Sequence, residues 1–123
     1  ERFEDVKVWQ EARKLVNMVY EAINENNRFN RDYRLLNQIQ AAAVSAMSNI
    51  AEGFSRKGNK EFVQFLFISK SSAAEVQSQL YVALDQKYID EDTFEKIYVQ
   101  AETVSKMNSG LIKYLNTKLN NSK

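Results

Sequence analysis

Apolar residues recur at three- and four-residue steps along most of this chain, which is the spacing of one face of an α-helix. In the first such segment, about residues 4–26, they are Trp9, Ala12, Val16, Val19 and Ile23. The pattern stops in the asparagine-rich run at residues 24–30. Asparagine favours turns because its side chain competes for backbone hydrogen bonds. The first helix is therefore predicted to end in this run.

Three further segments show the same spacing, at about residues 32–53, 60–87 and 90–119. Alanine and serine fill the middle of the second, so a neighbouring helix is expected to approach it closely. Gly53 is expected to end that helix as a C-cap with positive φ, and Asp90 to cap the fourth. Gly110 lies inside the fourth helix at a cost of about 1 kcal/mol relative to alanine, which predicts a close backbone contact there.

The chain has no proline and only three glycines in 123 residues. So few breakers favour long, uninterrupted elements, and helices are the elements that run so long. Four helices joined by short loops predict an all-α fold, an antiparallel up-down-up-down four-helix bundle. The length fits one domain, so residues 1–123 are predicted to form a single four-helix-bundle domain.

The amino-acid composition limits the kinds of catalytic and metal site that the chain can form. There is no cysteine and no histidine, which excludes thiolate nucleophiles, disulfides and the commonest general base and transition-metal ligand. No glycine-rich phosphate loop is present. We therefore expect no enzyme, no cofactor or metal, and no small-molecule substrate. No apolar run approaches the ~20 residues of a membrane span, and the first ten residues are charged, so a cytoplasmic protein with no membrane partner is expected.

A polar face runs along the second and third helices at three-, four- and seven-residue steps. Its members are Gln38, Ser45, Asn49 and Glu52, then Ser72 and Glu75. Two carboxylates without histidine do not match the pattern of a di-metal bundle. An interhelical hydrogen-bond network, or a polar seam at a subunit contact, is favoured over a ligand or metal site. Asn49, Glu52, Ser72 and Glu75 are expected to be at least half buried and bonded across the two helices.

Charge is nearly balanced, with 17 Lys plus Arg against 16 Asp plus Glu, but it is unevenly distributed. An up-down bundle gathers the N-terminus, the loop at residues 53–60 and the C-terminus at one pole. The candidate nucleic-acid-binding residues at that pole are Arg56, Lys57, Lys60, Lys113 and Lys118. A solvated asymmetry is the simpler interpretation. The alternative is weak, sequence-tolerant binding of RNA or DNA through phosphate contacts.

The chain is rich in aromatic residues, with seven Phe, six Tyr and one Trp. Core and oligomer packing is favoured for them over a base-stacking platform. Phe67 and Tyr114 belong to a surplus of apolar surface that one small bundle cannot hide. This surplus predicts a homo-oligomer.

Several segments resemble one known family. They are Phe-Glu-Asp-Val-Lys-Val-Trp-Gln at 3–10, Ser-Asn-Ile-Ala-Glu-Gly at 48–53 and Phe-Val-Gln-Phe-Leu at 62–66. They resemble the four-helix-bundle proteins encoded in intervening sequences of bacterial large-subunit (23S) ribosomal RNA genes. That family is related to the accessory variability protein of diversity-generating retroelements, which partners a reverse transcriptase and binds nucleic acid.

The resemblance implies a non-enzymatic bundle that assembles with itself, with a ring-shaped pentamer as the expectation. The chain departs from the family pattern where Gln40-Ala41 replaces an Arg-Arg pair and Ala46-Met47 replaces Ile-Pro. Losing the arginines weakens the inference of nucleic-acid contact on that face. The leading hypothesis is an oligomeric bundle that binds RNA or DNA through its basic pole. The alternative is a protein–protein scaffold with no nucleic-acid role.

Overall fold

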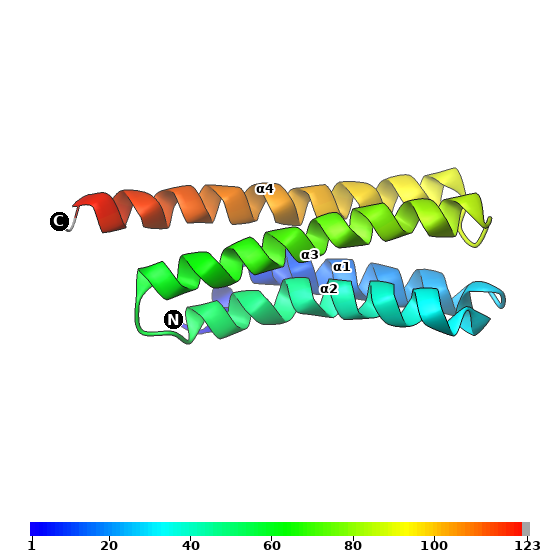
Figure 1. Cartoon of the computed structure of the whole chain (residues 1–123), viewed down its shortest axis with the longest axis horizontal. Coiled ribbons are helices and arrows are strands. Elements are labelled where there is room, and N and C mark those ends of the chain that lie inside the picture. The colour runs from blue at the N-terminus through cyan, green and yellow to red at the C-terminus, as the bar shows by residue number, and fades with distance from the viewer. Residues whose placement is uncertain (122–123) are drawn as a thin grey trace.

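The computed structural model describes residues 1–121, which contain four α-helices, two short 3-10 helices and no strand. In chain order the elements are η1 (Phe3–Asp5), α1 (Lys7–Asn24), η2 (Phe29–Arg31), α2 (Tyr33–Phe54), α3 (Asn59–Asp85) and α4 (Glu91–Asn121). The four α-helices lie along one long axis and alternate in direction (Figure 1). The predicted antiparallel up-down-up-down bundle is confirmed.

Side chains cap the starts of α2 and α4 and shape the turn after α1. Asn26 Oδ1 accepts hydrogen bonds from the backbone N–H groups of Arg28 and Phe29, at 3.0 and 2.9 Å, and so shapes the turn after α1. Asp32 caps α2 by accepting from the N–H of Leu35. Asp90 Oδ1 accepts from the N–H of Thr93 at 2.8 Å, so its predicted role as the cap of α4 is confirmed.

The core is drawn from all four helices. Leu15, Ile39, Leu66 and Val104 are each at most 1% exposed and represent α1 to α4 in turn. The middle of α2 contributes buried alanines to this core, which allows α3 to pack closely against it.

The close backbone contact is at Gly53, not at Gly110. A Cβ at Gly53 would lie 2.7 Å from Phe65 Cβ and 2.8 Å from Phe62 Cδ1, whereas nothing lies within 4 Å of one at Gly110. Gly53 has no positive φ, and α2 continues through Phe54. The predictions of a C-cap at Gly53 and a tight contact at Gly110 are therefore wrong. Glycine at 53 makes room for α3, and Gly110 faces solvent.

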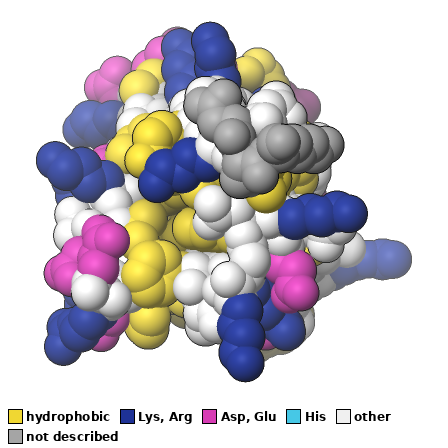
Figure 2. Space-filling model, turned by 90° about the vertical axis from the view of Figure 1, so that its left-hand side faces the viewer, with side chains coloured by type: hydrophobic (Ala, Val, Ile, Leu, Met, Phe, Trp, Pro, Cys, Tyr) yellow, Lys and Arg dark blue, Asp and Glu magenta, His cyan; other side chains and the backbone are white. Residues whose placement is uncertain are grey.

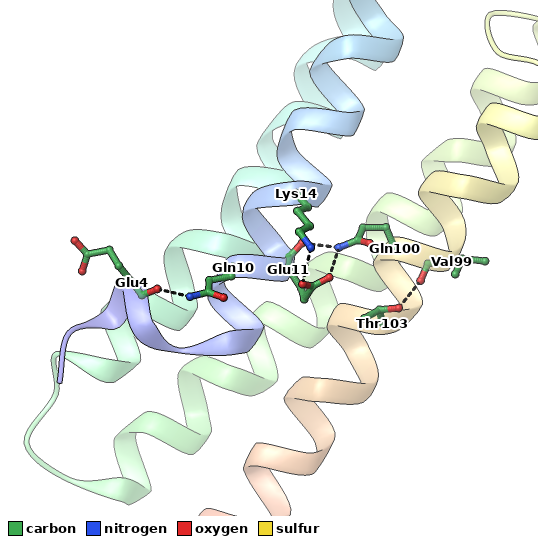
Figure 3. A network of polar contacts seen from close by, with 7 residues as sticks. All are labelled: Glu4, Gln10, Glu11, Lys14, Val99, Gln100 and Thr103. Carbon is green, nitrogen blue, oxygen red and sulfur yellow. Dashed lines mark hydrogen bonds and ion pairs between the residues drawn. The ribbon is translucent and has the colours of Figure 1, made fainter.

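A polar contact joins α1 to α4 at mid-height (Figure 3). Gln100 Nε2 donates to the backbone oxygen of Glu11 at 2.8 Å and to its Oε1 at 3.1 Å, and Lys14 Nζ bonds Glu11 Oε2 at 3.1 Å. The hydrogen bond from Gln100, followed by that from Lys14, lowers the pKa of the Glu11 carboxyl. Oε1 of this carboxylate thus joins α1 to α4, whereas Oε2 bonds Lys14 within α1.

Candidate functional site

The five candidate residues for nucleic-acid binding lie at one end of the bundle. Here the α2–α3 connection lies beside the N-terminus, and α4 projects past the other helices (Figure 1). We call this the lysine-rich end; its defining residues are Arg56, Lys57, Lys60, Lys113 and Lys118. Figure 2 shows Lys and Arg side chains around its rim, with exposed hydrophobic side chains between them.

Of these five residues, Arg56 forms an ion pair within the described part of the chain and the four lysines do not. Arg56 Nη2 lies 2.6 Å from Glu52 Oε1, and its guanidinium lies 4.9 Å from the centre of the Phe65 ring. Arg56 is therefore committed to its own bundle. The four lysines are exposed, and within residues 1–121 none of them lies in an ion pair. Lys118 Nζ lies 4.9 Å from the centre of the Tyr114 ring, but no carboxylate neutralises any of the four charges within these residues.

The N-terminus of α3 opens at the same end. Its N-cap is Gly58, which has extended backbone (φ −122°, ψ 147°) and offers no side-chain cap to the first N–H groups of the helix. Lys57 and Lys60 flank it. Uncapped N–H groups and the positive end of the helix dipole attract anions, and the two lysines add to this attraction.

Acidic residues also occur at the lysine-rich end, which the charge pattern alone did not emphasise. Glu4 pairs with Arg2 at 3.4 Å, and Glu52 pairs with Arg56. Glu61 lies exposed in the first turn of α3. The excess of positive charge here is therefore smaller than a list of its bases suggests. It comes mainly from the lysines.

The predicted polar seam between α2 and α3 forms only at its centre. The Oγ atoms of Ser45 and Ser72 lie 2.9 Å apart and join the two helices. Asn49 is half-buried, and its Nδ2 donates to Oγ and to the backbone oxygen of Ser45, one turn earlier in α2. Asn49 thus supports the serine pair without reaching α3 itself.

The outer members of the seam lie in solvent. The Glu52 side chain is 52% exposed and bonds Arg56, which lies just past the end of α2 and not on α3. Gln38 and Glu75 are exposed and line a shallow groove beside Ser45. The expectation that Glu52 and Glu75 are buried and bonded across the helices is wrong. Only serine-sized side chains fit between helices packed this closely, and a carboxylate loses less by staying hydrated.

A buried polar relay that the sequence analysis missed lies one turn away from the seam. Asn108 of α4 donates from Nδ2 to Ser69 Oγ at 3.0 Å, and Ser69 of α3 donates to the backbone oxygen of Ala46 in α2 at 2.6 Å. Both side chains are 0% exposed, and Asn108 Oδ1 has no donor. The signal was present, because Asn108 occupies a core position of the α4 stripe between Val104 and Ile112.

The opposite end of the bundle carries a broad hollow of about 860 Å³. Its lining includes the carboxylates of Glu25, Asp85, Asp90 and Glu91. The backbone N–H of Thr93 lowers the pKa of Asp90, which already serves as a helix cap. Within residues 1–121 no three acidic side chains are grouped so that they could hold a metal ion.

None of the helices in the described part of the chain has the length and apolar character needed to cross a membrane.

A family model and a solved structure both show which known proteins this chain resembles. The family model of the 23S rRNA-intervening sequence protein matches residues 4–110. A crystal structure from Bacteroides thetaiotaomicron, described as a protein of unknown function from the S23 ribosomal protein family, superposes with a TM-score of 0.72. The two sequences are 23% identical, and the superposed region covers 87% of this chain and 95% of the other chain. The two proteins therefore share the fold. No curated protein matches. The chain belongs to the 23S rRNA-intervening sequence protein family.

Proposed function

We propose that this protein acts by binding rather than by catalysis, and that its lysine-rich end contacts the phosphates of RNA or DNA. The observation that carries the proposal is the group of Lys57, Lys60, Lys113 and Lys118. All four are exposed, and none is neutralised by a carboxylate within residues 1–121. The uncapped start of α3 beside two of them supports the same ligand chemistry.

Such a surface binds without regard to sequence, because phosphate contacts carry no base information. One copy of it is weak, since Glu4, Glu52 and Glu61 share the same end. Self-association into a ring, with a pentamer as the expected form, would repeat the surface once per subunit. Linked weak contacts raise the overall affinity by making later contacts effectively intramolecular.

Fluorescence anisotropy with labelled RNA and DNA at about 50 mM salt tests the proposal. Lys57→Gln with Lys60→Gln is expected to weaken binding and to reduce the log–log salt slope for duplex DNA by about 1.8, since each phosphate contact contributes about 0.9. Arg31→Gln with Arg34→Gln is the matched control, because it removes two exposed charges near the other end. Absence of binding to both nucleic acids at micromolar protein would refute the proposal.

A protein–protein scaffold is the second candidate function, and the outer face of α3 favours it. Ile68 and Val82 are 47% and 45% exposed and lie on one face with Ser71 and Ser78. Exposed Glu75 is the one charged residue of this face between Ile68 and Val82, and a face that is otherwise uncharged suits contact between copies. If nucleic acid does not bind and the protein still self-associates, the scaffold is the better account.

A further inference from the structure

A groove of about 430 Å³ runs between the first half of α3 and the last turns of α4. Phe67 and Lys70 line it from α3, and Lys113, Asn116 and Thr117 line it from α4. Among the residues that the structure describes, no acidic one contributes to its lining. This absence contrasts with the neighbouring rim, where Glu52 neutralises Arg56. The groove is therefore a distinctly basic recess at the lysine-rich end.

Phe67 is unusual among the phenylalanines of residues 1–121, because it is 51% exposed and the others are buried or half-buried. An aromatic ring that stays exposed to water does not gain the stabilisation that burial gives the core aromatic residues. Its neighbours are cationic, since Lys70 lies one turn further along α3 and Lys113 lines the α4 side of the groove. An exposed ring with lysines on both sides combines a stacking surface with phosphate partners.

The polar side chains of the groove differ in which hydrogen-bonding groups they can present to a ligand. Thr117 Oγ1 donates back to the oxygen of Lys113 in its own helix at 2.9 Å, so its donor is used. Asn116 is exposed in the same wall. An asparagine amide has both a donor and an acceptor, which suits the edge of an unpaired base.

From this geometry we propose that the groove binds a single-stranded segment of nucleic acid. One base stacks on Phe67, and the adjacent phosphates contact Lys70 and Lys113. The proposal rests on the proposed function and specifies its ligand: unpaired bases rather than a duplex. In a duplex both faces of each base are already stacked, whereas a flexible strand can present a free face to the ring.

The test measures anisotropy with three labelled oligonucleotides of equal length: a mixed-sequence single strand, the matching duplex and an abasic strand with the same phosphates. The wild type is expected to bind the single strand about tenfold more tightly than the abasic strand, the size of effect that one stacked base supplies. Phe67→Leu keeps an apolar side chain but removes the ring. It is expected to lower single-strand affinity about tenfold and to leave abasic binding unchanged.

Phe67→Trp should retain the preference for the single strand, because the larger ring still stacks. Val99→Ala is the matched control: it alters an exposed apolar residue of α4 that does not line the groove and lies away from the outer face of α3. Lys70→Gln with Lys113→Gln should weaken both the single strand and the abasic strand, since both carry phosphates. Light scattering of each variant reports whether assembly has changed.

The outcomes separate the two proposals. Equal binding of single strand, duplex and abasic strand, with Phe67→Leu silent, overturns the groove and leaves phosphate binding at the lysine-rich end in place. Failure to bind any of the three overturns both. A Phe67→Leu variant that changes the assembled mass, while Val99→Ala does not, would assign the ring to a subunit contact and also overturn the groove.

Discussion

The Tyr88 hydroxyl donates a 2.9 Å hydrogen bond to Oδ2 of Asp32, whose Oδ1 accepts the backbone N–H of Leu35. A single carboxylate therefore caps α2 and ties it to the α3–α4 connection. The Tyr88 ring stacks on buried Phe29, with centroids 5.3 Å apart. The two connections at this end are thus held together by one polar and one aromatic contact.

Tyr88→Phe is expected to lower the urea midpoint at pH 7 while keeping the ring contact with Phe29. The hydrogen bond to Asp32 raises the pKa of Tyr88 above its ordinary value of 10.0, so the folded state favours the neutral phenol. Its contribution is fully present below that ordinary value and is lost as pH rises through the raised pKa. The difference between wild type and variant should therefore shrink at strongly alkaline pH. Equal midpoints at pH 7 would contradict the contact.

The two helical glycines should respond oppositely to alanine. Gly53→Ala places a Cβ 2.7 Å from Phe65 Cβ and is expected to destabilise by about 1–3 kcal/mol through overpacking. Gly110→Ala meets nothing within 4 Å and is expected to stabilise by up to about 1 kcal/mol, because alanine is the better helix former. Chemical denaturation measures both. A stabilising Gly53→Ala would contradict the close α2–α3 contact, and a destabilising Gly110→Ala would contradict the open space at Gly110.

Ser69→Ala is expected to cost about 1–3 kcal/mol, because it leaves the Ala46 oxygen and the Asn108 amide without this partner in a buried site. Ser45→Ala is the matched control. Its hydroxyl is only part-buried, so we expect about 0.5–1.5 kcal/mol. Equilibrium denaturation compares the two. A smaller loss for Ser69→Ala than for Ser45→Ala would show that the relay contributes less than its burial implies.

Self-association is predicted to use the outer face of α3. Wild-type protein should scatter light as a homo-oligomer, with a pentamer expected, and Ile68→Asp with Val82→Asp should shift it toward the monomer, because buried unpaired carboxylates are costly. Val99→Asp alters a residue of α4 that is 50% exposed and should leave the mass unchanged. A monomeric wild type at micromolar concentration would end this prediction.

Periodicity was enough to predict the four helices and their order, because each helix buries one face. Local chemistry located two connections: the asparagines after α1 and the Asp90 cap of α4 act within a few residues of their own position. The gathering of basic residues at one end followed from connectivity alone. An up-down bundle with short loops places the α2–α3 connection and both chain ends together.

The contacts between helices were less predictable, since periodicity identifies a face but not the neighbour it meets. The role of Gly53 depends on where Phe62 and Phe65 of α3 approach it. Ser69 was overlooked because serine is common on helix surfaces, and its burial arises only when α2 and α4 enclose it. The Glu52–Arg56 pair, in contrast, has the four-residue spacing of a helical ion pair and could have been anticipated.

Because α4 projects past its neighbours, the last turns of that helix are less stable against local unfolding than its middle. Leu115 is the last residue of α4 in the buried core, and Asn116, Thr117 and Lys118 are exposed. Amide hydrogens beyond this point should exchange through local fraying, at rates set by the helix end rather than by global unfolding. These turns supply the outer half of the α4 wall of the Phe67 groove, through Asn116, Thr117 and Asn120. A ligand bound in the groove therefore suppresses fraying of these turns. By the same coupling, any contact that suppresses the fraying raises the affinity of the groove for that ligand.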